Sequence, residues 1–343
     1  MNFLTEELNK ALAELALNGL AQPDNEKFIT EFASQKAALL RGNLNISGVE
    51  MLKSQRNEFS EFTQLNESRW QTGFDLLETH IRICIESGVD LHRNMQNGSE
   101  NEDLFLFTVL LRHHARACHI SNEILCLLKN GFSDAAHARW RALHEVNVTA
   151  MFIDKHGEEC ARRFDAHEII DCYDGMKEHK KFEHRLNSKA PEQSIIDNYK
   201  IMFDAAKKEF GKGFETHYGW AAIYFPDRTP KSVGFRALEQ DVELEHMRPY
   251  YKMASQNVHA GSKGTKSRLA LSECEDDVLI VGQSSSGMCD PAHSTALSLM
   301  QITLTLLKFN PNIDNVVLMN LLRKYAEDIG DAFKFALEKS NSD

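Results

Sequence analysis

The feature that most constrains the fold is a pair of helix-forming segments, residues 102–129 and 133–154, joined by a very short turn. Apolar side chains recur at heptad spacing in the first segment, which is typical of a helix with one packed face. Asn130-Gly131 supplies residues that tolerate positive φ at a helix end, and Ser133 is a good N-cap for the second segment. So short a connection forces the two helices to lie antiparallel. The sequence therefore predicts a long antiparallel helical hairpin.

Helical periodicity continues through most of the chain. Apolar residues at steps of three and four mark further helices at residues 67–87, 292–308 and 314–338. Residues 277–282 (Asp-Val-Leu-Ile-Val-Gly) are the only segment whose pattern allows a β-strand. We therefore predict an all-α protein, a helical bundle built on the long antiparallel hairpin.

The start of the chain is predicted to be a helical extension. An amphipathic helix is expected at residues 4–18, and a loop rich in Gly and Asn is expected at residues 41–48 between two further helices. These patterns divide the chain into an N-terminal helical extension, residues 1–65, and a main helical domain, residues 66–343. The extension either packs against the main domain or binds a protein partner.

Composition limits the classes of function. The net charge of -11 over 343 residues argues against a general nucleic-acid coat, although it leaves room for a local basic pocket. The seven cysteines include no C-x-x-C pair, which favours reduced thiols in a cytoplasmic protein. The first residues lack the pattern of a signal peptide, and no apolar run approaches the roughly 20 residues of a membrane span. We expect a cytoplasmic protein without membrane contact.

The second helix of the hairpin carries charged residues on an otherwise apolar surface. Arg139, Arg141, His144 and Glu145 lie among apolar residues that cover most sides of the helix, which indicates a central, buried position. Charged groups are costly to bury unless they are paired. We therefore predict a buried ion-pair cluster, in which Arg141 neutralises Glu145.

Antiparallel pairing also predicts partners on the first helix. Residues whose numbers sum to about 262 lie at one level if the helical rise is uniform. The pairs expected at one level are Arg116 with Glu145, Arg139 with Glu123, and His119 with His144. Such a cluster either serves only the fold or forms an anion-binding or catalytic site.

Two motifs for bound groups fail on inspection. Gly282 and Gly287 have the spacing of a phosphate-binding P-loop, but the lysine that would reach the phosphates is missing. His144-Glu145 begins like a zinc-protease motif, but Val148 replaces the second histidine. We therefore expect no metal site and no cofactor.

An arginine followed by a histidine after four to six residues occurs at three places. The pairs are Arg112 with His119, Arg139 with His144, and Arg162 with His167. This spacing resembles that of HEPN (higher eukaryote and prokaryote nucleotide-binding) ribonucleases. In those enzymes the arginine contacts phosphate, and the histidine handles protons as the RNA 2′-hydroxyl attacks the adjacent phosphorus. The resemblance implies RNA cleavage without a metal ion.

A late helix, residues 250–260, offers a second histidine. Tyr251, Ser255 and His259 lie at steps of four and share one face of that helix. In one interpretation Ser255 orients His259, and the basic residues that follow attract an anion; in the other, His259 is a buried or capping residue before Gly261. The basic residues are Lys263, Lys266 and Arg268.

The chain also resembles a family of uncharacterised bacterial proteins known as a domain of unknown function. The resemblance covers about residues 70–310 and implies an all-helical fold without fixing a reaction. Proteins of this kind are distantly similar to HEPN-like helical bundles of bacterial defence. The matching elements are Arg116, the Gly-x-x-x-x-Ala turn at Gly131–Ala136, the expanded Arg-x-Leu-x-Glu motif at Arg139–Glu145, and Ser255 with His259.

The function predicted from the sequence is that of a HEPN-like protein that cleaves RNA without a metal ion or binds a nucleotide, in phage defence or as a toxin, and forms a homodimer. The alternative is a non-catalytic interaction or scaffold protein with a structural ion-pair cluster. Arginines would bind phosphate, a histidine would act as acid or base, and Glu145 would hold an arginine in position. The candidate residues are Arg139, His144 and His259 for catalysis, and Arg116, His119, Arg141, Glu145, Tyr251 and Ser255 for binding.

Overall fold

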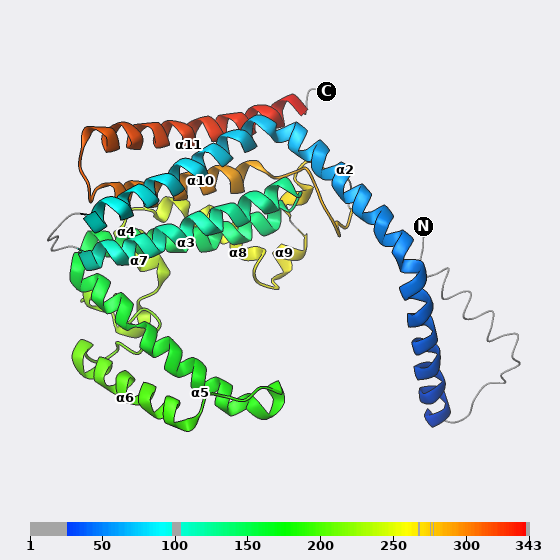
Figure 1. Cartoon of the computed structure of the whole chain (residues 1–343), viewed down its shortest axis with the longest axis horizontal. Helices are drawn as coiled ribbons and strands as arrows, with labels where there is room; N and C mark the ends of the chain where they lie inside the picture. The colour runs from blue at the N-terminus through cyan, green and yellow to red at the C-terminus, as the bar shows by residue number, and fades with distance from the viewer. Residues whose placement is uncertain (1–25, 98–103, 267, 275, 277, 341–343) are drawn as a thin grey trace, which may run out of the picture. The chain divides into compact units, whose positions relative to one another are not determined.

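The computed structural model describes residues 26–97, 104–266, 268–274, 276 and 278–340. These residues form α-helices and short 3₁₀ helices, and no β-strand occurs among them. The predicted all-α fold class is confirmed. Figure 1 shows the helices in chain order. They are α2 (Glu26–Asn97), α3 (Leu104–Lys129), α4 (Ser133–Ala166), α5 (Glu168–Leu186), α6 (Gln193–Phe210), α7 (Phe235–Asp241), α8 (Arg248–Gln256), α9 (Ser262–Lys266), α10 (Cys289–Leu307) and α11 (Ile313–Ser340).

The chain divides into two compact units, Met1–Leu65 and Asn66–Asp343. In the first unit the described residues form the first part of α2, and the loop predicted at residues 41–48 is wrong because these residues are helical. Each glycine in that stretch costs a helix only about 1 kcal/mol relative to alanine, and no proline interrupts it. The helix predicted at residues 4–18 lies outside the described residues.

The core of the second unit is the α3–α4 hairpin with α10 packed against both of its helices. Helix α11 packs against α10, and all four lie alongside one another in Figure 1. The later part of α2 contributes buried aromatic residues to this core. Phe333 of α11 lies 5.6 Å from Trp70 and 5.5 Å from Phe74, measured between ring centroids. These contacts bury apolar area from α2 and α11, which stabilises the bundle.

The turn of the hairpin is built as the sequence predicts. Gly131 has a φ of 79°, and the amide of Phe132 donates to the carbonyl of Leu127 across the end of α3. The second helix is longer than predicted, because α4 continues past residue 154 to Ala166. Gly157, with φ 76° and ψ -158°, bends α4 within this extra length.

The later part of α4 holds the segment that follows α6. Arg163 is buried, and its guanidinium donates to the backbone carbonyls of Trp220, Phe210 and Gly219. The ring of Trp220 packs edge-on against Phe164, with 5.0 Å between centroids. One guanidinium therefore satisfies several carbonyls of a chain segment that has little regular structure of its own.

The β-strand allowed by the pattern at residues 277–282 is wrong for residues 278–282, which have no regular secondary structure; Asp277 lies outside the described residues. Leu279 is 91% exposed and Val281 is 100% exposed. No neighbouring strand offers a partner within the described part of the chain, and an unpaired β-strand is not stable in water. Alternating apolar residues alone do not make a strand.

Candidate functional site

Four of the candidate residues meet where α8 packs against α4, and we call them the Arg141 cluster: Arg141, Glu145, Tyr251 and His259. The Arg141 Nε donates to Glu145 Oε1 at 3.1 Å, and the hydroxyl of Tyr251 donates to the same oxygen at 2.5 Å. Nη1 of Arg141 lies 3.3 Å from Nε2 of His259. The predicted pairing of Arg141 with Glu145 is confirmed, but the predicted burial is wrong, because the two side chains are 22% and 39% exposed. The cluster joins α4 to α8 and to the chain just beyond it.

The electrostatics of the cluster favour a charged Arg141. Partial burial acts to lower the pKa of Arg141, but the hydrogen bonds and charges of Tyr251 and Glu145 outweigh it, so the pKa is raised. Burial raises the pKa of Tyr251, and the bond to Glu145 raises it further. Arg141 also lies over the Tyr251 ring, with its Cζ 4.9 Å from the centroid. The guanidinium is therefore held on three sides.

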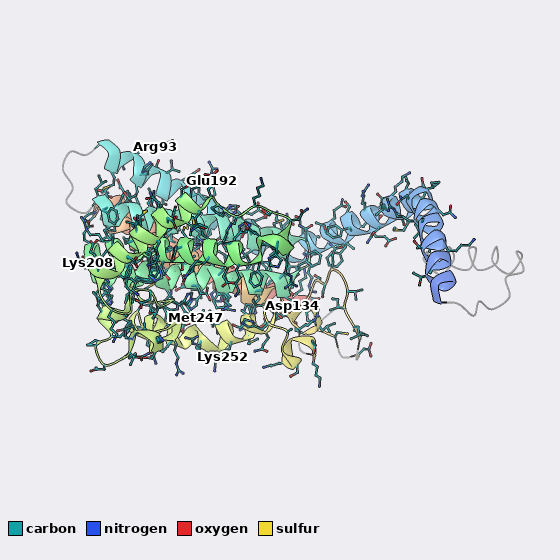
Figure 2. The ribbon with its side chains drawn as sticks, turned by 90° about the horizontal axis from the view of Figure 1, so that it is seen from below. Arg93, Asp134, Glu192, Lys208, Met247 and Lys252 are labelled. Atoms are coloured by element: carbon teal, nitrogen blue, oxygen red, sulfur yellow. The ribbon has the colours of Figure 1, made fainter. Side chains whose placement is uncertain are left out.

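The role predicted for Ser255 is wrong. Its hydroxyl donates to the backbone carbonyl of Tyr251 at 2.7 Å and makes no bond to the ring of His259. Serine one turn along a helix commonly satisfies the preceding carbonyl in this way. The ring of His259 is oriented instead by Arg141, and its backbone amide donates to the Ser255 carbonyl. Figure 2 labels Met247, the residue just before α8, Lys252 within α8, and Asp134 in the first turn of α4.

His144 belongs to a sealed cluster that adjoins the Arg141 cluster, because the Tyr251 ring lies 6.0 Å from the ring of His144, measured between centroids. Its side chain is 1% exposed, and its Nε2 lies 2.9 Å from Oε1 of Glu239, which is 0% exposed. Arg248 forms an ion pair with the other oxygen of Glu239. The ring of His144 stacks on Trp140, whose indole N–H donates to the Ser294 carbonyl at 2.9 Å. A histidine enclosed in this way has no path to a large substrate.

Arg139 lies with residues of α3. It forms an ion pair with Glu123, as predicted from the antiparallel register. His119 also contacts Glu123, at 3.3 Å, and is mostly exposed. The predicted proximity of His119 to His144 is therefore wrong. The two residues are level along the hairpin, but a level does not fix which side of each helix faces the partner.

Arg116 lines a cavity of about 510 Å³ between α3, α4, α5 and the segment after α6, which we call the α3–α4 cavity. Glu145 lines the same cavity, but the predicted ion pair between Arg116 and Glu145 is wrong, because Glu145 turns to Arg141 and Tyr251 instead. His113 lies beside Arg116; burial lowers its pKa, and the charge of Arg116 lowers it further. Arg116 and Glu145 lie at the same level of the hairpin and line the same cavity, but they do not form an ion pair with each other.

Two smaller cavities lie at the other end of the Arg141 cluster. The first, of about 300 Å³, is called the His137 cavity, and the second, of about 460 Å³, is called the His259 cavity. Asp134, Gln256, Asn257 and Arg268 line both of them, so the two cavities adjoin.

Sequence reasoning missed Glu239, Arg248 and His137. Glu239 comes from a helix of seven residues that carries no motif, so nothing local indicates its burial. Arg248 lies three residues before Tyr251, and His137 lies four before Arg141. Each shares a helix face with a residue that was identified, and this periodicity is the signal that could have found them.

Neither a metal site nor a membrane-spanning helix is found in the described part of the chain. Among the residues that the structure describes, no three His, Cys, Asp or Glu side chains converge so that they could hold a metal ion. Within the same part of the chain, every helix is too short or too polar to cross a lipid bilayer.

Comparison with known proteins adds the family. No curated protein and no solved structure matches the chain. A family model described as "Family of unknown function (DUF5677)" matches residues 107–277, which include the hairpin except the first three residues of α3, and the whole Arg141 cluster. The link to HEPN proteins and the bacterial origin stay predictions. Residues 107–277 of this chain thus belong to a family of unknown function, as the sequence resemblance implied.

Proposed function

We propose that this protein is a metal-independent endoribonuclease of the cytoplasm and that RNA is cleaved at the Arg141 cluster. The observation that carries the proposal is the contact of 3.3 Å between Nη1 of Arg141 and Nε2 of His259. An arginine beside an exposed histidine is the pair of groups that metal-independent RNA cleavage needs. A cytoplasmic location agrees with the free state of all seven cysteines.

The protonation of His259 follows from its partner. Arginine can only donate hydrogen bonds, so Nε2 of His259 accepts in this contact and carries no proton. A phosphate that enters the cluster takes over the Arg141 N–H, which frees Nε2 of His259. Glu145 and Tyr251 hold the guanidinium from the other side. Because the side chain of Arg141 is already ordered, it loses little conformational freedom when phosphate binds.

The proposed reaction uses the RNA's own hydroxyl. Nε2 of His259 takes the proton of the 2′-hydroxyl, the 2′-oxygen bonds to phosphorus, and the bond from phosphorus to the 5′-oxygen breaks. The leaving 5′-oxygen takes a proton from water, and the resulting hydroxide takes the proton from His259. The products are a 2′,3′-cyclic phosphate and a 5′-hydroxyl, while Arg141 stabilises the charge that develops on the phosphate oxygens.

The test is incubation of single-stranded RNA with the full chain in EDTA. We expect cleavage with 2′,3′-cyclic phosphate ends, identified by mass spectrometry, and no cleavage of the same sequence in DNA or with 2′-O-methyl groups. His259→Ala should lower the rate by about 10²-fold or more, which is the usual contribution of a general base. Arg141→Lys should also be slow, because lysine keeps the charge and loses the fork of donors.

Two further variants sharpen the test. His184→Ala removes an exposed histidine outside every site described above and should cleave at the wild-type rate. His144→Asn should keep its activity if the protein stays folded, because His144 is sealed. Intact RNA with the wild-type protein would end the proposal, as would full activity in His259→Ala.

A second candidate function is that of a non-catalytic interaction protein. The sealed pair of His144 and Glu239 favours it, because this part of the predicted cluster serves packing. The exposed apolar side chains of Leu279 and Val281 also favour it, since such residues often mark binding surfaces. This candidate gains if the wild-type protein leaves RNA intact in EDTA. Light scattering tests the predicted homodimer in either case.

A further inference from the structure

The His137 cavity has an unusual inner wall. His137 is 0% exposed, and neither of its ring nitrogens has a hydrogen-bond partner. Its ring stacks on Trp140 at 5.4 Å between centroids, and Trp140 is fixed by its bonds to Ser294 and Ser298. Buried polar atoms are nearly always paired, so two unpaired nitrogens on one ring indicate that a polar group binds there. Burial lowers the pKa of His137 to about 4, so the ring is neutral and offers one donor and one acceptor.

The mouth of the cavity is positively charged. Lys263 and Arg268 line it, and neither forms an ion pair with a carboxylate of the described residues. The carboxylate among the lining residues belongs to Asp134, which accepts hydrogen bonds from the backbone amides of Leu269 and Ala270. Asp134 is therefore occupied, and the two cations remain available to an anion.

Between His137 and the two cations, the His137 cavity is lined by both apolar and polar side chains. Met253 and Leu269 supply apolar surface, and Gln256 and Asn257 supply amide groups that both donate and accept. A cavity of about 300 Å³ lies at the lower end of the range for small-molecule sites. The volume suits a single planar heterocycle, with the rest of its molecule at the mouth.

We propose that the His137 cavity binds one nucleotide unit of the substrate. The base enters the cavity and hydrogen-bonds to the amides of Gln256 and Asn257, and it reaches His137 once the side chains that cover the ring move aside. The phosphate binds Lys263 and Arg268. The adjoining His259 cavity shares Arg268 with this one, so the bound unit lies beside the Arg141 cluster. The inference rests on the proposed function for its place in catalysis, but nucleotide binding is measurable without cleavage.

Calorimetry with the full chain tests the subsite. The probes are the four nucleoside 3′-monophosphates and inorganic phosphate. We expect the wild-type protein to bind at least one nucleotide ten-fold or more tightly than phosphate. His137→Phe keeps the stacking on Trp140 and removes the two nitrogens, so it should weaken the nucleotide ten-fold or more and leave phosphate unchanged.

Charge variants separate the two ends of the ligand. Arg268→Gln and Lys263→Gln should weaken nucleotide and phosphate alike, whereas Lys252→Gln, on the exposed face of α8, should weaken neither. If His137→Phe does not fold, Gln256→Leu replaces it, with the same expected loss of nucleotide affinity. Equal affinity for nucleotide and phosphate in the wild-type protein would overturn the subsite, and so would unchanged nucleotide binding in the folded His137 variant.

The failures of the two proposals are distinguishable. Tight nucleotide binding that His137→Phe abolishes, together with intact RNA, supports the subsite and ends the nuclease proposal. RNA cleavage with unchanged KM and kcat in His137→Phe supports the nuclease proposal and overturns the subsite.

Discussion

The Nε2 atom of His144 lies 2.9 Å from Oε1 of Glu239, and neither side chain is more than 1% exposed. The two residues come from α4 and α7, and Arg248 of α8 completes the group. A carboxylate shared by two donors in the interior is stable only while all three members are present.

Loss of Glu239 should therefore be costly. Glu239→Ala leaves the buried His144 and the largely buried Arg248 without their partner, and removal of one member of a buried pair costs about 3–5 kcal/mol. Urea denaturation followed by tryptophan fluorescence measures the change in the free energy of unfolding. Glu239→Gln keeps an acceptor for His144 and should lose less. Glu178→Ala, at an exposed ion pair on α5, is the control and should change little. A stable Glu239→Ala protein would contradict the structural role of this group.

The stability of the protein should fall in mild acid. Burial lowers the pKa values of His80 and His114 to about 4, whereas the unfolded chain takes up these protons near pH 6.5. Because the folded values are lower, stability is complete above pH 6.5 and is lost as the pH falls from 6.5 towards 4. Each histidine contributes a slope of about 1.4 kcal/mol per pH unit. Urea denaturation at pH 6.5 and pH 5 measures this slope, and His114→Asn should reduce it. An unchanged free energy of unfolding between these pH values would contradict the prediction.

Gly73 of α2 should resist substitution. A Cβ at this position would lie 2.6 Å from Cε2 of the buried Phe333 ring. Gly73→Ala should destabilise the protein by about 1–3 kcal/mol, the usual cost of overpacking, and Phe333→Leu should recover part of it. Gly175→Ala is the matched control, because a Cβ there meets nothing within 4 Å. That change, inside α5, should stabilise the protein by about 0.5–1 kcal/mol. Thermal denaturation ranks the variants, and equal effects at the two positions would show that packing at Phe333 is loose.

Cysteine reactivity should follow burial. Cys126 and Cys274 are exposed, and Cys84, Cys118 and Cys160 are buried. Burial raises the pKa values of Cys118 and Cys160 to about 12, so almost no thiolate forms there at neutral pH. Iodoacetamide should label Cys126 and Cys274 in the folded protein and reach the buried three only after denaturation. Mass spectrometry of tryptic peptides measures the order in which the cysteines are labelled. Labelling of Cys118 as fast as Cys126 would contradict the burial of Cys118.

Local patterns predicted the hairpin and two of its ion pairs. Arg141 and Glu145 are one turn apart on a helix, and Arg139 and Glu123 are equally distant from a short turn, so geometry alone brings each pair together. The predicted pairs of Arg116 with Glu145 and of His119 with His144 were wrong. The angular position of a residue around its helix, and not only its level, decides which side chains face each other. Arg116 points into a cavity, and His119 faces solvent.

The partner of His144 was beyond prediction for another reason. Glu239 lies 95 residues further along the chain, on a helix too short to show periodicity. Its burial depends on tertiary packing between α4, α7 and α8, which no local pattern records. The continuous helix α2 was missed because a local pattern was given too much weight. Gly and Asn at residues 41–48 favour a loop in general, but they do not forbid a helix.

The bend at Gly157 has a consequence for how this chain can change. Arg163 reaches the Trp220 carbonyl, 3.0 Å away, only because the stretch between the bend and Arg163 has its present length. One residue inserted between Gly157 and Arg163 would swing the guanidinium by about 100° around the helix axis and advance it by about 1.5 Å. Single-residue insertions or deletions there would uncouple α4 from the segment that lines the α3–α4 cavity, whereas an extra residue in the exposed link between α5 and α6 would leave that coupling intact.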